Sequence, residues 1–500
     1  MDINKCKEWK LNKTINPMTN RKIKIEGPTY KKLQNLCKIY QKISFYKSSL
    51  KSSLSSLLST TSSSSVSSSL IDSSVVYSLF SNINKSLKEQ IINIIKIRRK
   101  KNLLIINNFL NQKFKIDGDN NCLTIKKNKL YINNIIKLNN IIGIGGYGIS
   151  YLLKYINEEK KEIIRYVIKL TVINKKENLH EIRILELLTK YAINYEFPHF
   201  PMTYDILYCN NDKLNSSLIK KIKYIDDDIY NILNKYSGKG DILFIVNEYV
   251  DGGDLRTFNR FITNKYNYEN IQKYFLNAIS QILISLMFYH KLVNSNHCDL
   301  HQHNVLNHLT EPGGYFHYKL YEKDYYIENI GYIWVIWDFG LSVPFDNSLQ
   351  INKLREEELK NHIFNYLKKT NEYNNLSSYL GRDKKDSREH FLYDENNNKY
   401  LIKKDNILFD LIFLSDSKSP YCIYSYYLKN NINEYPFIAK LINTFNSNVV
   451  HKCLKLNLSA YDLPIMDNLI IEWMLKMNLL LTELPLNAKI INKDNPYILS

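Results

Sequence analysis

The spacing of hydrophobic positions changes along the chain and predicts both helices and strands. Residues 84–115 carry isoleucines at helical spacing, and from residue 129 the pattern breaks into short segments of the kind that form strands. A long amphipathic helix is predicted over 271–292, and an apolar, aromatic strand over 333–337. The chain therefore contains a part built from short strands, followed by a part that opens with a long helix.

A glycine-rich stretch near the start of the strand-forming part fits the pattern G-x-G-x-x-G. It comprises Gly143, Ile144, Gly145, Gly146, Tyr147 and Gly148. The same letters occur in dinucleotide sites that continue into a helix. Here a strand, a polar turn and a second strand follow, and the second strand ends at Lys169. This order predicts a hairpin over phosphate groups, with Lys169 reaching the α- and β-phosphates.

The helix expected over residues 180–188 supplies a partner for that lysine. Glu181 can turn toward Lys169 and hold its ammonium group in place. Glu177 and Glu186 are alternative partners. Glu181 is favoured because Leu185, one turn further on, would then face the same interior.

An apolar strand over residues 244–250 breaks into a polar turn and predicts the adenosine contacts. The backbone at Glu248 and Val250 can hydrogen-bond the edge of an adenine. Asp254, six residues after Glu248, is placed to accept hydrogen bonds from ribose hydroxyls. It can equally be the N-cap of the next helix, and the two roles are compatible.

The polar stretch 297–306, which follows the long helix, carries the groups that phosphoryl transfer requires. Asp299 can orient a substrate hydroxyl, and Asn304, five residues on, can bind a metal ion through its amide oxygen. Asp338 follows an apolar strand and precedes Phe-Gly, which predicts a second metal ligand on a turn. Asn304 and Asp338 together would hold Mg²⁺ or Mn²⁺ against the phosphates.

In this order, these elements resemble the eukaryotic-type protein kinase fold over roughly residues 130–480. The resemblance implies an α+β, bilobal architecture with a small β-rich N-lobe and a larger, mostly helical C-lobe. It implies ATP and Mg²⁺ as cofactors, Asp299 as the base or hydroxyl orienter, and Val167 with Leu306 on either side of the adenine. His297 and Phe339 would stack in the interior with Leu185.

Several positions depart from that family's pattern. Ser150 stands where a valine usually covers the adenine. Cys298 replaces the arginine that binds a phosphorylated activation loop, and His301 replaces a lysine near the γ-phosphate. An extra hairpin is expected between Asn304 and Asp338. No Ala-Pro-Glu follows, and Asp410 is expected to anchor the backbone of the loop that holds Asp299.

The N-terminal residues 1–47 are strongly basic, with 12 lysines and arginines against three acidic residues. Cys6, Asn16-Pro17, Gly27-Pro28-Thr29-Tyr30 and Cys37 resemble the two-cysteine adaptor module of large DNA viruses, which implies an adaptor role. Whether the two thiols bridge stays open, and zinc is not expected from two cysteines without a nearby histidine.

The predicted organisation joins these parts in five segments. They are the basic module 1–47, a Ser-rich flexible linker 48–83, a helical extension 84–128, the N-lobe and hinge 129–255, and the C-lobe with an enlarged activation segment 256–500. The basic cluster 98–101 within the extension fits a nuclear-import or nucleic-acid patch, but a solvated helix face is favoured.

Composition and charge limit the possible binding partners and the cellular compartment. The net charge of +19 over 500 residues suits acidic partners or nucleic acid, although a lysine-rich codon bias explains it equally well. Seven scattered cysteines do not form a secreted disulfide framework. No membrane span or signal segment is expected. Together with the resemblance to the adaptor module of large DNA viruses, this implies a protein of the host cytoplasm (the viral factory) or the virion, with no membrane partner and no requirement for nucleic acid.

The favoured function is a viral serine/threonine protein kinase acting on protein substrates. Two alternatives remain. A kinase fold acting on a small molecule is suggested by His301 and by the missing Ala-Pro-Glu segment. A non-catalytic adaptor with a kinase-like scaffold would not need Lys169, Asp299, Asn304 and Asp338 together.

Overall fold

The structure, a computed structural model, describes the chain in ranges separated by gaps. The ranges are 15–16, 21–22, 30, 91–113, 122–145, 148–157, 162–173, 176–209, 216–235, 241–346, 389–393, 395–396, 398–415, 423–424, 426–427 and 432–499. Most of the basic module with Cys6 and Cys37, the linker 48–83, Gly146 with Tyr147, and much of the segment after Asp346 lie outside them. In the module, β1 (Ile15–Asn16) pairs with β2 (Arg21–Lys22) in an antiparallel arrangement.

The described elements form two compact units of mixed α and β structure, which is compatible with a kinase-like fold. The first contains residues 96–194 and 202–249. The second contains residues 195–201 and 250–500, together with the first turn of the helix that begins at Ile91.

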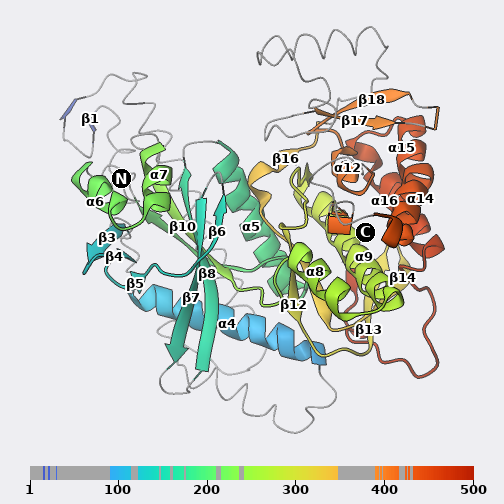
Figure 1. The fold of residues 1–500 in the computed structure, drawn as a ribbon, viewed down its shortest axis with the longest axis horizontal. Helices are drawn as coiled ribbons and strands as arrows, with labels where there is room; N and C mark the ends of the chain where they lie inside the picture. Colours follow the sequence, from blue (N-terminus) through green and yellow to red (C-terminus); the bar gives the residue numbers. More distant parts are fainter. Residues whose placement is uncertain are drawn as a thin grey trace. The chain divides into compact units, whose positions relative to one another are not determined.

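A five-stranded antiparallel sheet forms the centre of the first unit (Figure 1). Its strands, in sheet order, are β6 (Ile141–Gly145), β7 (Gly148–Asn157), β8 (Glu162–Ile173), β10 (Asp241–Glu248) and β9 (Thr203–Cys209). The apolar residues of β8 from Ile164 to Leu170 and those of β10 from Ile242 to Val246 are buried, as expected for central strands, whereas Ile163 near the start of β8 is 58% exposed. The two strands predicted between the glycines and Lys169 are confirmed as β7 and β8, while residues 158–161 of the predicted turn lie outside the described ranges.

Two helices pack on this sheet. Helix α5 (Lys176–Asn194) contacts β8 and β9, and confirms the helix predicted over 180–188. Helix α4 (Ile91–Lys113) lies beside the strands (Figure 1), with Phe109 against Tyr155 of β7 at a ring-centroid distance of 4.8 Å. Helices α6 (Ser216–Lys223) and α7 (Asp227–Lys235) lie in the segment of the chain that connects β9 to β10.

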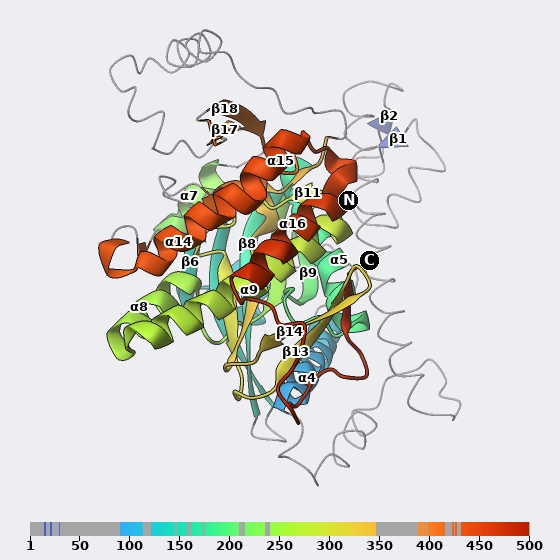
Figure 2. The same ribbon diagram turned by 90° about the vertical axis from the view of Figure 1, so that its right-hand side faces the viewer.

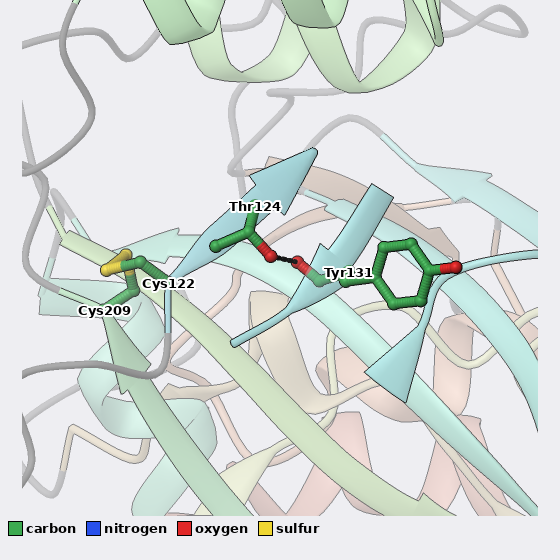
Figure 3. The surroundings of a disulfide bond; sticks show 4 residues. All are labelled: Cys122, Thr124, Tyr131 and Cys209. Atoms are coloured by element: carbon green, nitrogen blue, oxygen red, sulfur yellow. Dashed lines mark hydrogen bonds between the residues drawn. A yellow bond between two sulfur atoms is a disulfide. The ribbon is translucent and has the colours of Figure 1, made fainter. Parts of the chain in front are cut away.

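A small three-stranded sheet precedes the glycine-rich stretch and is tied to the main sheet by a disulfide. It contains β3 (Leu123–Lys126), β4 (Lys129–Ile132) and β5 (Ile136–Lys137). The boundary expected at 128/129 therefore falls within the β3–β4 turn. Cys122, beside β3, is bonded to Cys209 at the end of β9, 87 residues later (Figure 3). No spacing signal in the sequence indicated this pair.

The second unit is built around α9 (Tyr268–Val293), the long helix predicted over 271–292. Helices α8 (Leu255–Lys265) and α16 (Leu463–Lys476) pack on it (Figure 2). The helical part also contains α12 (Ile412–Ser415), α14 (Pro436–Phe445), the π-helical η5 (Asn446–Val450), α15 (His451–Leu456), and the short 3-10 helices η2 (Phe339–Leu341), η3 (Phe409–Leu411), η4 (Ile432–Glu434) and η6 (Ala460–Asp462).

The strands of the second unit form small sheets beside these helices. The pairs are β11 (Ser295–Asn296) with β16 (Val343–Pro344), β12 (Val305–Leu309) with β15 (Tyr332–Ile336), and β17 (Glu389–Tyr393) with β18 (Lys399–Lys403). The extra hairpin expected between Asn304 and Asp338 is confirmed as β13 (Tyr315–Leu320) and β14 (Lys323–Glu328). The sequence did not indicate that β19 (Tyr497–Leu499) would join β13 in parallel.

Helix α9 is the one helix among the described residues that is long and apolar enough to cross a membrane by length and composition. However, 72% of its apolar window is buried inside the structure. Ile279, Ile282, Leu283 and Phe275 are each 0% exposed, and α8 and α16 pack against the helix. Its apolar character is therefore explained by its place in the core of the second unit.

The disulfide predicts a redox-dependent stability. In the absence of a reductant, replacing Cys122 with serine should lower the free energy of unfolding by about 2–4 kcal/mol. The reason is that the variant lacks the cross-link that restricts the unfolded wild-type chain. Dithiothreitol should destabilise the wild type to a similar extent and leave Cys122→Ser unchanged. Urea unfolding with and without the reductant measures both. Identical curves for wild type and variant in the absence of reductant would show that the bond does not contribute.

Candidate active site

Lys169 and Glu181 form the ion pair that the sequence predicts. The Nζ of Lys169 lies 2.6 Å from Oε1 of Glu181, and their side chains are 14% and 5% exposed. Strand β8 supplies the lysine and helix α5 supplies the glutamate. The competing Glu186 is buried elsewhere on α5, and burial raises its pKa to about 8 although Arg183 opposes the shift. The pairing of Lys169 with Glu181 is thus a property of the first unit itself.

The register of the sheet brings other predicted nucleotide contacts to the face that carries Lys169. Lys169 of β8 pairs with Ser150 of β7. Val167 lies two residues before Lys169, and Gly148 lies two residues before Ser150, so all four residues are on the same face of the sheet. An added Cβ at Gly148 would lie 2.3 Å from the carbonyl oxygen of Leu170, so close strand packing by itself requires glycine there. Gly143 and Ile144 lie on β6, where the Ile144 side chain is 58% exposed.

Glu248 lies on β10, and its side chain points to the opposite face of the sheet. Its strand partner is Tyr166, whereas the neighbouring Asn247 pairs with Val167 on the Lys169 face. The carboxylate of Glu248 accepts hydrogen bonds from Arg99 of α4, at 2.8 Å from Nε and 2.6 Å from Nη2. A nucleotide contact at Glu248 would therefore have to use its backbone.

This contact corrects the expectation that residues 98–101 form a solvated helix face. Arg99 is 4% exposed. It shares one face of α4 with three buried apolar side chains, which follow it at helical spacing: Leu103, Ile106 and Leu110. That spacing was the available signal, and the surrounding basic residues obscured it.

In the second unit, the buried carboxylate of Asp410 anchors the loop that carries Asp299, as predicted. Asp410, in η3, is 0% exposed. It accepts the backbone N–H of His297 at 2.7 Å and that of Cys298 at 2.9 Å, and Nε2 of His290 donates to it at 2.8 Å. Burial alone would raise the pKa of Asp410, but hydrogen bonds and charge from His290 and His297 hold it below its ordinary value.

Within this loop, Asp299 and Asn304 are in direct contact. The Nδ2 of Asn304 donates to the backbone oxygen of Asp299 at 2.8 Å and to its Oδ2 at 3.1 Å. Because the amide nitrogen faces Asp299, the amide oxygen is directed away from that carboxylate. His301 lies beside them, with Nε2 3.7 Å from Oδ1 of Asp299. Burial lowers the pKa of His301 to about 4, aided by the charges of His303 and His297, so the ring is neutral at pH 7.

Asn304 and Asp338 stand at neighbouring ends of two paired strands. Val305 of β12 pairs with Ile336 of β15, and the Trp337 N–H donates to the backbone oxygen of Asn304 at 2.8 Å. The donor set is one carboxylate and one amide oxygen, which suits Mg²⁺ bound together with phosphate oxygens and water. No cluster of three or more His, Cys, Asp or Glu side chains able to hold a metal occurs in the described ranges.

Backbone strain is concentrated at two residues of this region. Cys298 has φ +61° and Asp338 has φ +62°, which are uncommon values for residues other than glycine. Such strain persists where the surroundings fix the backbone, and here Asp410 binds the N–H of Cys298. The Cys298 thiol is buried, and burial raises its pKa, so a buried neutral group stands where the kinase pattern has an arginine.

The contact predicted between His297 and Phe339 is present, and the part of that prediction that concerns Leu185 stays a prediction. The rings of His297 and Phe339 lie 5.1 Å apart, and Phe339 stacks on Tyr289 of α9 at 5.2 Å. The His297 Nε2 also lies 2.9 Å from the Trp337 oxygen. These contacts connect the start of the Asp299 loop to the turn that carries Asp338.

Asp254 is the N-cap of α8, as one interpretation of the sequence held, and it also contacts the Asp299 loop. Its Oδ1 accepts the Thr257 N–H at 2.7 Å, and its Oδ2 lies 2.6 Å from Nδ1 of His303. A β-bridge joins Asp254 to Leu306 of β12. The sequence did not indicate the role of His303, because it lies 49 residues from its partner. Val250, just before this segment, is buried.

The segment 251–255 is fastened to β12 by a further side chain that the sequence did not single out. The backbones of Gly252 and Asn307 bond at 2.8 Å, and the Asn307 amide donates to the oxygens of Gly252 and Gly253. A Cβ at Gly252 would lie 1.7 Å from the Asn307 side chain. Glycine is therefore required at this close approach.

Comparison with known proteins identifies one domain and a partial similarity. Residues 5–38 match the 2-cysteine adaptor domain. The chain is 38% identical over 69 residues to the "Probable serine/threonine-protein kinase 380R" of Invertebrate iridescent virus 6. It is 26% identical over 183 residues to the serine/threonine-protein kinase ppk35 of Schizosaccharomyces pombe. A 33-residue stretch is 58% identical to the uncharacterised protein 378R of Invertebrate iridescent virus 6.

These similarities cover short parts of both partners. The match to 380R spans 13% of this chain and 13% of the relative, and the match to ppk35 spans 36% of this chain and 23% of the relative. The match to 378R spans 7% of this chain and 17% of that protein. The adaptor domain is thus identified at the N-terminus, and the similarity to serine/threonine kinases is weak and partial.

The Asp410 anchor predicts a large stability effect. Asp410→Asn should cost about 3–5 kcal/mol, because the buried groups that bond to the carboxylate lose a charged acceptor. Since the folded-state pKa is lowered, the contribution is fully present at neutral pH and is lost as the pH falls below the ordinary carboxyl range. Urea unfolding at pH 7 and at pH 3, below the ordinary carboxyl pKa, measures this, with the exposed Asp324→Asn as control. A loss equal to that of the control would contradict the anchoring role.

Proposed function

We propose that this protein is an ATP- and Mg²⁺-dependent protein kinase that transfers the γ-phosphoryl group to serine or threonine hydroxyls. The observation that carries the proposal is the contact of Asp299 with Asn304 in a loop whose backbone is held by the buried Asp410. Phosphoryl transfer depends on positioning and electrostatic stabilisation, and such a fixed loop supplies positioning. The partial similarity to two serine/threonine kinases supports the choice of acceptor.

Each group has a role in the proposed reaction. Lys169, held by Glu181, places positive charge at the α- and β-phosphates. Asp299 orients the acceptor hydroxyl and receives its proton as the oxygen–phosphorus bond forms and the bond from the γ-phosphorus to the ADP oxygen breaks. Asn304 and Asp338 would hold Mg²⁺, which supplies charge neutralisation at the phosphate oxygens when bound. The 2-cysteine adaptor domain at residues 5–38 would recruit a partner protein.

Loss of the proposed base should reduce transfer without removing nucleotide binding. Asp299→Asn should lower the rate of γ-phosphoryl transfer from radiolabelled ATP to a basic or acidic model protein by about 10²–10⁴-fold. Asp338→Ala should abolish the Mg²⁺-dependent reaction. Asp324→Asn, which changes a carboxylate on the β13–β14 hairpin, serves as the control and should retain activity. Wild-type protein that labels no protein, itself included, would contradict the proposal.

A small-molecule acceptor is the second candidate, and the neutral ring of His301 favours it. The kinase pattern has a lysine there, whereas His301 carries no charge at pH 7. The sequence also has no Ala-Pro-Glu segment after Gly340. The same labelled-ATP assay with sugars, amino alcohols and nucleosides separates the candidates. Product formed only with one of these compounds would favour the second candidate over protein phosphorylation.

A further inference from the structure

Helix α4 lies before the part of the chain that resembles a kinase, yet it is anchored in the core of the first unit. Its buried stripe continues from Leu103, Ile106 and Leu110 back to Arg99 at a spacing of four residues. An arginine at a core position is costly unless its charge is paired. The buried position of Arg99 therefore requires a partner of opposite charge.

That partner is Glu248, and the pairing is bidentate and buried. Two guanidinium nitrogens of Arg99 contact the two carboxylate oxygens at 2.8 and 2.6 Å, with side chains 5% and 2% exposed. Fork-to-fork pairs of this kind fix orientation as well as distance. A second contact from α4 reaches β9, where the Asn107 amide donates to the Tyr204 oxygen at 3.0 Å.

The same carboxylate also determines where the end of β10 lies. Oε1 of Glu248 accepts the Met202 N–H at 2.9 Å, while the Glu248 N–H donates to the Met202 oxygen at 2.9 Å. Glu248 is thus fixed to the start of β9 through both its backbone and its side chain. Arg99 bonds to the same oxygen as Met202, so it orients the carboxylate that makes this second link.

We propose that Arg99 is a positioning residue for nucleotide binding, which acts through Glu248 on the backbone at the end of β10. The inference rests on the proposed function, because it requires that this backbone bind the adenine of ATP. The side chain of Glu248 points away from the Lys169 face, so its effect on the nucleotide is indirect. Helix α4, which follows the adaptor domain and the Ser-rich segment in the sequence, is then part of the nucleotide-binding apparatus.

The test compares substitutions of Arg99 in the full-length chain. Arg99→Met should raise both the Kd and the KM for ATP by about tenfold, the size of effect expected for a lost charged hydrogen bond, with little change in kcat. Arg99→Lys should have an intermediate effect, because a lysine keeps the charge but cannot bridge both oxygens. Arg260→Met, on the exposed side of α8, is the matched control and should leave the Kd and KM unchanged.

A thermal-unfolding measurement on each variant separates positioning from folding. A lower Tm for Arg99→Met with unchanged Kd and KM for ATP would overturn the proposal, as would a fall in kcat alone. If Arg99→Met does not fold, the double variant Arg99→Met/Glu248→Met tests the same point, because no charge is left buried. Its ATP affinity should stay weak, and wild-type affinity would overturn the proposal. Wild-type protein that does not bind ATP would instead refute the proposed function.

Discussion

The candidate active site depends on the hydrogen bonds that the buried carboxylate of Asp410 accepts from the backbone of the Asp299 loop. This carboxylate binds two consecutive backbone N–H groups at the start of the Asp299 loop, and one of these belongs to Cys298, whose backbone is strained. A charged acceptor with no exposure to water gives strong hydrogen bonds and is costly to remove. From this fixed start the chain continues through Asp299 to Asn304, where the pairing of β12 with β15 sets the position of Asp338.

The first unit uses the two faces of one sheet for separate tasks. Alternate residues of a strand point to opposite faces, so Lys169 and Glu248 are directed to different helices although β8 and β10 are neighbours. Lys169 meets Glu181 of α5, and Glu248 meets Arg99 of α4. The helix on one face holds a proposed phosphate contact, and the helix on the other holds the end of β10. The N-terminal extension is therefore an integral part of this unit.

The contacts of the site that a motif or a family resemblance specifies could be predicted from the sequence, even where the partners lie 113 residues apart, as Asp410 and His297 do, and the other contacts could not. The Lys169–Glu181 pair and the Asp410 anchor were found because a motif and a family resemblance fixed their partners. The Arg99–Glu248 pair was missed because an arginine inside a basic run resembles a solvated residue. Cys122 and Cys209 are 87 residues apart, and His303 lies 49 residues from Asp254, so no local pattern joins either pair.

The unusual residues of the loop alter its electrostatics, while the residues proposed for phosphoryl transfer are all present. A buried thiol and a neutral imidazole stand where the resembled family has two cations, yet Asp299, Asn304 and Asp338 are retained. In the proposed reaction, Lys169 is the residue assigned to supply positive charge at the phosphates. The most direct measurement is γ-phosphoryl transfer from radiolabelled ATP by wild type and Lys169→Met in parallel. Labelled protein is expected with the wild type alone, and equal labelling by wild type and Lys169→Met would contradict the proposed role of Lys169.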